Sequence, residues 1–197
     1  ILHTSGTTSK PKMVALTHNN LLNSAKNIST ALKLTTKDKN IILMPSFHIH
    51  GIIASILAPL YNGGKVVALP KFNVLSFYNF LDIHSPSWFT AVPTMLQSII
   101  DRSKNNLKIV KKNKLRFIRS SSASLPKNTL KEVEALFRTP VIESYGMTEA
   151  THQMTTNLLP PFKRKVGSVG VPIGLEVKII NNNLNFIKKT EEGEIVI

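Results

Sequence analysis

Hydroxyl, glycine and lysine residues crowd one segment near the beginning of the chain, from His3 to Lys12. It reads His-Thr-Ser-Gly-Thr-Thr-Ser-Lys-Pro-Lys and precedes a strand-like run, residues 13–16. Backbone N–H groups, hydroxyls and ammonium groups in such a loop can bind phosphate oxygens. The segment is not a Walker A loop, because no second glycine lies between Gly6 and Lys12 and Met13 stands where that motif has Ser or Thr. A phosphate-binding loop and a hydroxyl-rich surface loop are the two interpretations of this pattern.

Three histidines are the second set of residues that could do chemistry. His48 and His50 lie in the run Pro-Ser-Phe-His-Ile-His-Gly, and His152 follows shortly after Glu149. A zinc site would need three converging ligands, each with a hydrogen-bond partner behind it. The sequence places no acidic residue near these histidines in a position that suits this role. Histidines packed in the interior are the plain alternative. A pocket for a small anion, with the imidazoles as hydrogen-bond donors, is the functional one.

Apolar runs alternate with helical patterns along most of the chain, and these elements must position the polar residues. Strands are predicted at 41–44, 65–69, 88–92, 115–119 and 140–143, and helices at 21–32, 51–61, 74–83, 94–100 and 124–137. This alternation indicates βαβ units around a mainly parallel sheet, the α/β class. From residue 166 glycine and asparagine become frequent between two short strands, 176–180 and 194–197. We therefore expect an α/β portion over 1–165 and a β-rich edge, a meander, over 166–197.

Composition excludes several classes of protein. Of the 197 residues, 42% are hydrophobic, enough for a substantial core, and none is cysteine. The chain therefore has no disulfide, thiolate zinc site or thiol nucleophile. Its longest apolar stretch is about ten residues, too short to cross a bilayer, and no signal-peptide pattern opens the chain. We expect an intracellular protein, cytoplasmic or peroxisomal, and both ends look like cuts within a longer chain.

The charge raises a rival interpretation, a nucleic-acid-binding module. Lys and Arg number 25 against 11 Asp and Glu, a net charge of +14. The densest basic stretch, residues 104–119, contains no acid; its basic residues are Lys104, Lys108, Lys111, Lys112, Lys114, Arg116 and Arg119. It has few aromatic residues for base stacking and no zinc-finger or RNP motif. We expect a solvated surface loop, and the salt dependence of DNA affinity would test the alternative.

The order of residues in the first loop narrows its interpretation. Residues 4–12, followed by Leu-Thr-His at 16–18, resemble the signature loop of the adenylate-forming enzymes. This family contains acyl-CoA synthetases, luciferases and peptide-synthetase adenylation domains. Ser9 and Met13 replace two glycines of the usual form. Further resemblances follow in the family's order at 45–51, 90–93, 115–126, 143–149, 167–170 and 193–194. The ordered set covers essentially the whole chain.

The resemblance implies that residues 1–197 form the central part of the family's large N-terminal domain, the AMP-binding domain. The family's later motifs do not occur in the chain. Among them are a Tyr-Arg-Thr-Gly-Asp-like segment, whose aspartate would hold ribose, and the small C-terminal domain with its catalytic lysine. We therefore expect this chain alone to bind ATP weakly and to form no measurable thioester.

The resemblance also implies a reaction and its residues. In such enzymes a carboxylate attacks the α-phosphate of ATP, and the acyl-adenylate then transfers its acyl group to the thiol of CoA. Lys12, Thr148 and Glu149 are the catalytic candidates, and Glu149 would bind Mg²⁺, which prefers oxygen ligands. The candidate ATP- or AMP-binding residues are Thr4, Ser5, Gly6, Thr7, Thr8, Lys12, Ser122, Ala123, Tyr145, Gly146 and Thr148. ATP, Mg²⁺ and the co-substrate CoA are the expected cofactors.

The residues predicted to line the acid pocket are polar: His48, His50, Ser121, Ser122 and His152. Imidazoles and hydroxyls suit a second carboxylate on the substrate, because a buried unpaired charge is costly. Residues 144–156 and 160–170 resemble the oxalate–CoA ligase branch, although Gly146 replaces an alanine common there. Oxalate is the predicted acid, with malonate and then an aromatic or fatty acid as alternatives. We expect no specific nucleic-acid partner, and the sequence predicts no oligomeric state.

Overall fold

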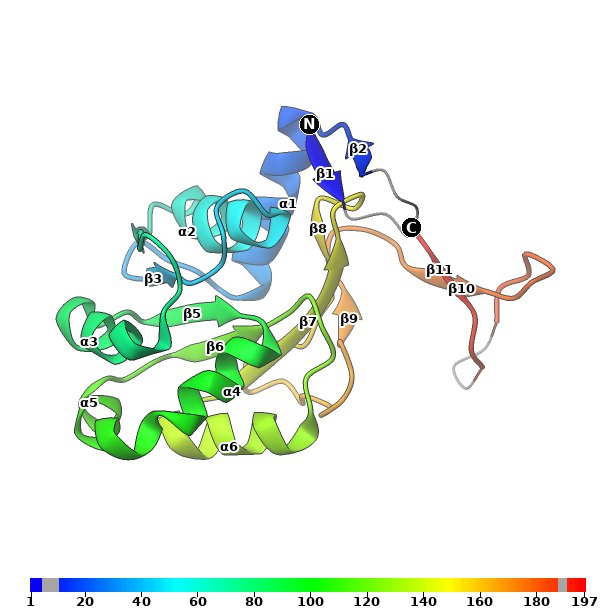
Figure 1. Ribbon diagram of the computed structural model, residues 1–197. Coiled ribbons are helices and arrows are strands. Elements are labelled where there is room, and N and C mark those ends of the chain that lie inside the picture. Colours follow the sequence, from blue (N-terminus) through cyan, green and yellow to red (C-terminus); the bar gives the residue numbers. More distant parts are fainter. Residues whose placement is uncertain (5–10, 188–190) are drawn as a thin grey trace.

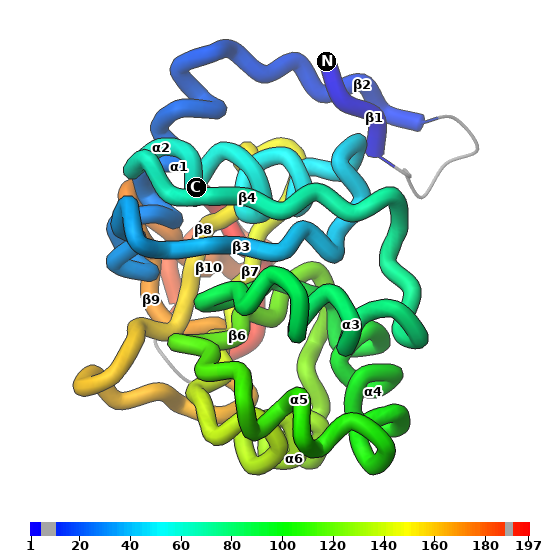
Figure 2. The backbone as a smooth tube through the Cα atoms, turned by 90° about the vertical axis from the view of Figure 1, so that its left-hand side faces the viewer, coloured from blue at the N-terminus to red at the C-terminus, as the bar shows by residue number. Residues whose placement is uncertain are grey.

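A seven-stranded, mainly parallel sheet forms the centre of the computed structural model, which describes residues 1–4, 11–187 and 191–197. The strand order is β4-β3-β5-β6-β7-β8-β9 (Figure 1, with β4 beside β3 in Figure 2). The first five strands in this order, β4, β3, β5, β6 and β7, are parallel to one another. β8 then pairs antiparallel with β7, and β9 pairs antiparallel with β8. Their bounds are β3 Lys39–Ile42, β4 Lys65–Val67, β5 Trp88–Ala91, β6 Phe117–Ser120, β7 Val141–Met147, β8 His152–Thr156 and β9 Val171–Pro172. The predicted α/β class is confirmed.

Helices cover both faces of the sheet and enclose two cores. One face packs against α3 (Val74–His84), α4 (Pro93–Asp101), α5 (Leu107–Lys112) and α6 (Lys127–Phe137); the other packs against α1 (His18–Ala31), the π-helix η1 (His50–Leu57) and α2 (Ala58–Tyr61). Figures 1 and 2 show these layers from perpendicular directions. In β5, Trp88 joins the α1–η1 core and Phe89 the α3–α6 core, as strand alternation requires. In the described residues no helix has the length and apolarity to cross a membrane.

Local sequence explains where several elements begin. Thr17 caps α1 reciprocally with Asn20: its Oγ1 accepts from the Asn20 N–H at 3.1 Å, and Asn20 Oδ1 accepts from the Thr17 N–H at 2.9 Å. Asn73 caps α3 in the same sense through a 2.8 Å bond from the Leu75 N–H. Pro93 opens α4 at a position where its missing N–H costs nothing. The predicted helices and parallel strands therefore appear close to their expected bounds.

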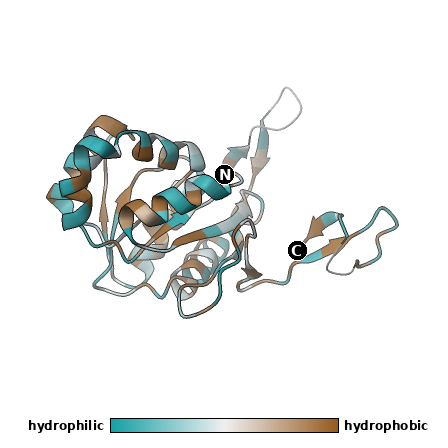
Figure 3. Cartoon of the chain, turned by 90° about the horizontal axis from the view of Figure 1, so that it is seen from below, coloured by the Kyte–Doolittle hydropathy of each residue, from teal (hydrophilic) through white to brown (hydrophobic). Residues whose placement is uncertain are grey.

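Two small hairpins lie outside the main sheet. β1 (Leu2–Thr4) and β2 (Lys12–Val14) pair antiparallel, with Thr4 opposite Lys12. β10 (Lys178–Ile180) and β11 (Glu194–Val196) form their own two-stranded sheet, which projects from the body (Figure 3). We expected these last strands to form a meander at the edge of the main layer. The edge is instead made by β8 and β9, and β8 was not predicted.

The basic stretch 104–119 is not the solvated loop that its charge predicted. A 3₁₀ turn, η2 (Ser103–Asn106), and α5 occupy its first half, with the lysines exposed. The two arginines are structural exceptions. Arg116 forms a bidentate ion pair with Asp38, with 3.0 Å bonds to both carboxylate oxygens, and Arg119 is completely buried.

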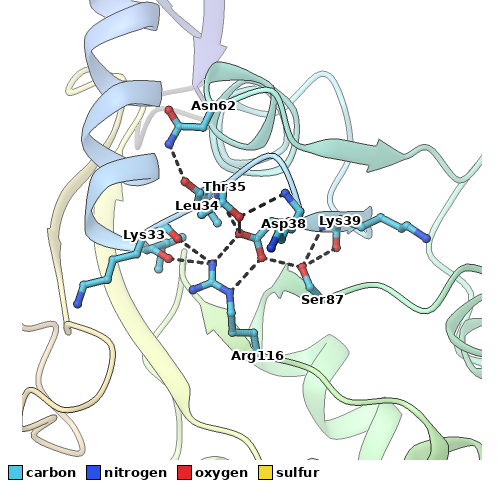
Figure 4. Close-up of polar contacts among 10 residues, drawn as sticks. Lys33, Leu34, Thr35, Asp38, Lys39, Asn62, Ser87 and Arg116 are labelled. Atoms are coloured by element: carbon cyan, nitrogen blue, oxygen red, sulfur yellow. Dashed lines mark hydrogen bonds and ion pairs between the residues drawn. The ribbon is translucent and has the colours of Figure 1, made fainter.

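Asp38 is the centre of a polar network that joins the starts of β3, β5 and β6 (Figure 4). Besides Arg116, its carboxylate accepts from the Thr35 N–H at 2.8 Å and from Ser87 Oγ at 2.8 Å. The Arg116 guanidinium also donates to the carbonyls of Leu32 and Lys33, at the end of α1. This network lies at the amino ends of the parallel strands and holds α1 against the sheet there.

Asp38→Asn is expected to lower the free energy of unfolding by about 2 kcal/mol, because the amide would turn an NH₂ group towards buried donors. The Arg116 side chain is 36% exposed and can be hydrated, so the loss stays below that of a fully buried pair. Urea denaturation monitored by far-UV circular dichroism measures it. Asp82→Asn, which breaks the exposed Lys112–Asp82 pair, is the matched control and should change stability by less than about 0.5 kcal/mol. Equal effects of the two substitutions would contradict the structural role of Asp38.

Candidate active site

Two adjoining cavities open where the loops follow the carboxyl ends of the parallel strands, the usual ligand position in such sheets. The first, the Lys12 cavity, has a volume of about 380 Å³ and is lined by Thr4, Lys12, His48, Ile49, Ser122, Gly146, Met147, Thr148, Glu149 and His152. The second, the Tyr145 cavity, has a volume of about 330 Å³ and is lined by Ser120, Ser122, Ala123, Ser124, Leu125, Glu143, Ser144, Tyr145, Gly146, Gly167 and Val169. Ser122 and Gly146 line both cavities. One ligand could therefore extend through the two.

The structure brings most of the predicted site residues to these cavities. Thr4 and Lys12 arrive on the β1–β2 hairpin, and Thr148 and Glu149 on the turn after β7. The predicted phosphate-binding residues Ser5, Gly6, Thr7 and Thr8 lie outside the described residues. Two predicted pocket residues line neither cavity. Ser121 is buried and donates to the Ser144 carbonyl at 3.1 Å, and His50 lies one layer behind Ser122.

The turn between β7 and β8 packs tightly against the first of these strands. A methyl group on Gly146 would lie 1.5 Å from the His152 carbonyl oxygen, and the register of the β7–β8 pair shifts between Tyr145 and Gly146. In this backbone Gly146 is thus a larger departure from the alanine of the resembling branch than the sequence suggests. Ser24 of α1 holds the turn from outside by donating to the Thr151 carbonyl at 2.5 Å.

Backbone strain gathers around the Lys12 cavity. Ser122, Thr151 and His152 have φ values of 72°, 54° and 90°, a region that non-glycine residues rarely adopt. Such strain persists only where the surrounding structure enforces it, and it is common at ligand-binding sites. Here it turns the segment after β6 and the start of β8 towards the same cavity.

Behind the cavity lies a buried cluster of His50, His152, Thr90 and Arg119. The rings of His50 and His152 stack with centroids 4.7 Å apart. His50 Nδ1 lies 2.9 Å from Ser122 Oγ, and its Nε2 lies 2.6 Å from Thr90 Oγ1 and 3.2 Å from Arg119 Nη1. Nε2 of His152 is buried and has no hydrogen-bond partner among the described residues.

This environment keeps the histidines neutral. Burial lowers the pKa of His50 and of His152 well below 6.5, and the positive charge of Arg119 lowers both further. Burial alone lowers the pKa of His48, which is more exposed. Burial lowers the pKa of Arg119 to about 9, so its guanidinium remains charged at neutral pH. The cluster therefore carries one buried positive charge beneath neutral imidazoles that can donate hydrogen bonds.

Arg119 is the site residue that the sequence analysis missed, because we counted it with the surface charge. A signal was available in the predicted strand 115–119. Side chains two residues apart in a strand share a face, so Arg119 had to point with Phe117 into the α1–η1 core. A charged residue at an inward position is a candidate for function rather than for the surface.

The neutral histidines predict a loss of stability in weak acid. Below pH 6.5 the unfolded chain protonates His50 and His152 while the folded chain keeps them neutral, so protons bind the unfolded state more. The free energy of unfolding should therefore fall from pH 7 to 5.5, by up to about 1.4 kcal/mol per pH unit for each histidine. Urea titrations across this range measure the slope.

Variants isolate the histidines from other groups in that titration. Burial raises the pKa of Glu143, which gives a slope of opposite sign in acid, but this contribution cancels when variants are compared at each pH. His50→Gln and His152→Gln should each flatten the slope, whereas His18→Gln on the exposed start of α1 should leave it unchanged. A slope that is equal in all four proteins would contradict the buried neutral state.

The residues around Glu149 suit a magnesium ion shared with phosphate. Mg²⁺ in nucleotide sites is usually bound by one or two carboxylates together with phosphate oxygens and water. Glu149 places one exposed carboxylate in the Lys12 cavity, beside the hydroxyls of Thr4 and Thr148. This donor set fits an ion held jointly by protein and nucleotide, and it would not form a closed all-protein site. Within the described residues no group of three His, Cys, Asp or Glu side chains is arranged to hold a metal.

Comparisons with known proteins agree with this geometry. An oxalate–CoA ligase of Arabidopsis thaliana is 44% identical over all of this chain, and one of Saccharomyces cerevisiae is 42% identical, also over all of it. The chain spans 38% and 36% of the lengths of these relatives. A solved malonyl-CoA ligase with methylmalonyl-CoA and AMP bound superposes with a TM-score of 0.84 at 30% identity, over 99% of this chain and 42% of that one. The sequence pattern of the family described as AMP-binding enzyme matches residues 1–197. The chain therefore belongs to the AMP-binding enzyme family.

Proposed function

We propose that the protein containing this chain activates oxalate with ATP to an acyl-adenylate and then forms oxalyl-CoA. The observation that supports this most is the meeting of the Lys12 cavity and the Tyr145 cavity at Ser122 and Gly146. Residues predicted to bind phosphate, adenine and a small acid thereby line two adjoining cavities. Two of the relatives above 40% identity are named oxalate–CoA ligases, which supports oxalate as the acid.

Each cavity suits one part of the ligand. The Tyr145 cavity offers an aromatic ring, the Ala123 methyl and backbone groups to a flat base. The Lys12 cavity offers an ammonium group, hydroxyls and a carboxylate to the triphosphate and its metal. In the first step a carboxylate oxygen of the acid bonds to the α-phosphorus, and pyrophosphate leaves. In the second the CoA sulfur, after losing its proton, bonds to the acyl carbon, and AMP leaves.

The protein residues would act by position and charge, the main contributions in phosphoryl and acyl transfer. Lys12 would neutralise charge that moves onto the leaving pyrophosphate. Thr148 would donate a hydrogen bond to the α-phosphate as it rearranges. Magnesium, held by Glu149 and the phosphates, would supply further positive charge there. These roles agree with the placement of all three side chains on the Lys12 cavity.

The lining of the Lys12 cavity favours a short diacid over a fatty or aromatic acid. His48, Ser122 and His152 offer polar groups where an apolar acid would need apolar contacts. The backbone N–H of His50 lies 3.2 Å from His48 Nδ1, so this nitrogen accepts and the other ring nitrogen of His48 carries the donating proton. Such donors can pair with a second carboxylate, which a hydrophobic pocket would leave unpaired. Malonate, one carbon longer, is the nearest alternative.

ATP–pyrophosphate exchange in the full-length protein tests this proposal. The assay is run separately with oxalate, malonate, coumarate and octanoate, with an acid-free control, and thioester formation is followed after CoA is added. Oxalate is expected to give the highest kcat/KM, with malonate second. Exchange with another acid and none above background with oxalate would reject oxalate. No exchange with any acid would reject acid activation as a whole.

A further inference from the structure

Arg119 carries a buried charge for which the reaction outlined above has no use. Its side chain is completely buried in β6, and none of the ion pairs among the described residues includes it. Nη1 lies 3.3 Å from Thr90 Oγ1 and 3.2 Å from His50 Nε2, Nη2 lies 3.2 Å from Gln153 Oε1, and Nε has no partner in the described part of the chain. A buried guanidinium with only neutral partners is costly, so a function for it is expected.

The hydrogen bonds around Arg119 favour one arrangement of protons. A guanidinium donates only, so His50 Nε2 must accept from Nη1 and cannot carry a proton itself. Thr90 Oγ1 then accepts from Arg119 and directs its own proton to the same lone pair of His50 Nε2, which the two donors share. Neutral His50 must therefore carry its proton on Nδ1, which donates to Ser122 Oγ at 2.9 Å. Because Ser122 Oγ accepts from His50, its own O–H is free to donate into the two cavities that Ser122 lines.

We propose that Arg119 is a positioning residue that fixes His50 as the Nδ1–H tautomer and thereby makes the Ser122 hydroxyl a hydrogen-bond donor to the bound acid. The consequence for the acid rests on the proposed function, whereas the tautomer does not. The opposite tautomer, with Nε2–H, would place two donors, Nε2–H and Nη1–H, against each other and would turn the Ser122 proton towards His50. The site would then present an acceptor to a carboxylate, which repels it. Arg119 thus acts on the acid through two other residues and from one layer behind the pocket.

Nitrogen-15 NMR of histidine-labelled protein tests the tautomer directly and needs neither ATP nor acid. The His50 resonances are assigned by their loss in His50→Gln. The expected spectrum shows a protonated Nδ1 and an unprotonated Nε2 at neutral pH. In Arg119→Met, which keeps length without charge or donors, the spectrum should show the Nε2–H tautomer or a mixture of both. A wild-type spectrum with protonated Nε2 overturns the proposal, whatever acid the protein uses.

Kinetics in the full-length protein tests the consequence. Arg119→Met should raise the KM for the acid about 10- to 100-fold, the loss of one hydrogen bond to a charged group, and leave the KM for ATP within about threefold. Ser122→Ala should have a similar effect, and the double variant should be no worse than either, because both remove the same donor. Arg116→Met is the control: it removes the arginine directly before β6, which pairs with Asp38, and it should change stability only. Additive effects of the two substitutions would contradict action through Ser122.

Discussion

Glu149→Gln in the full-length protein is expected to reduce ATP–pyrophosphate exchange by at least about 100-fold, the loss seen when one electrostatic partner of a reacting group is removed. Glu149 is the only acid among the described residues that line the Lys12 cavity. Glutamine keeps the size and an acceptor oxygen but lacks the charge that holds a hard divalent cation. The effect should therefore exceed that of any uncharged neighbour.

The dependence of exchange on Mg²⁺ concentration separates loss of metal binding from loss of folding. Exchange by the variant should recover partly as Mg²⁺ is raised, while its circular dichroism spectrum and unfolding midpoint remain those of the wild type. Glu132→Gln on the exposed face of α6 serves as the matched control and should exchange normally. If Glu149→Gln retained a third or more of the wild-type rate at low Mg²⁺, Glu149 would not be the ligand that we propose.

The parts of the fold that were predicted from sequence share a physical reason. The inner parallel strands are largely buried and contain apolar runs, and the runs at 41–44, 65–69 and 88–92 each end directly before a proline. The strand predicted at 88–92 is observed as Trp88–Ala91, and the helix predicted at 74–83 as Val74–His84. Composition and hydrophobic periodicity were enough to predict these elements, because a buried strand and an amphipathic helix each leave a local pattern in the sequence.

β8 escaped prediction because its sequence has neither of these signals. It reads His-Gln-Met-Thr-Thr, a polar run without alternation, yet all five residues are buried. β8 pairs with β7 and β9 and packs against α1 and η1, and its His152 and Gln153 contact the buried cluster, so its burial comes from residues distant in the sequence. The strained φ values of Thr151 and His152 at its beginning have no sequence signal either.

The sequence motifs predicted which segments form the candidate site, but they did not predict which of its residues are buried behind the cavities. Motif resemblance placed Thr4, Lys12, Thr148 and Glu149, and the structure brings these four to one cavity. Motif resemblance did not distinguish residues that line a pocket from residues that lie behind it. His50 and Arg119 belong to that second group, and only the distances among buried side chains reveal it. A count of charged residues does not distinguish an exposed lysine from a buried arginine. The alternation of side chains along the predicted strand makes that distinction.

His152→Ala is expected to lower kcat/KM for oxalate about 10- to 100-fold. The His152 ring is buried against His50 and lines the Lys12 cavity, and its Nε2 lacks a protein partner among the described residues. We infer that the imidazole contacts the acid, and a hydrogen bond to a charged group contributes about 1.5–3 kcal/mol. Alanine removes the imidazole while keeping a Cβ at the strained position, so the backbone cost is unchanged.

The pattern of losses distinguishes a contact with the acid from general damage to the cavity. The KM for oxalate should rise while the KM for ATP stays within about threefold, since the proposed nucleotide contacts lie on other residues. Malonate should lose a different factor, because its second carboxylate lies farther from the first and reaches the histidine differently. His18→Ala, an exposed histidine at the start of α1, should behave as the wild type. An equal rise in the KM for oxalate and the KM for ATP would mean that His152 contributes to packing alone. Unchanged oxalate kinetics would exclude His152 from the acid pocket.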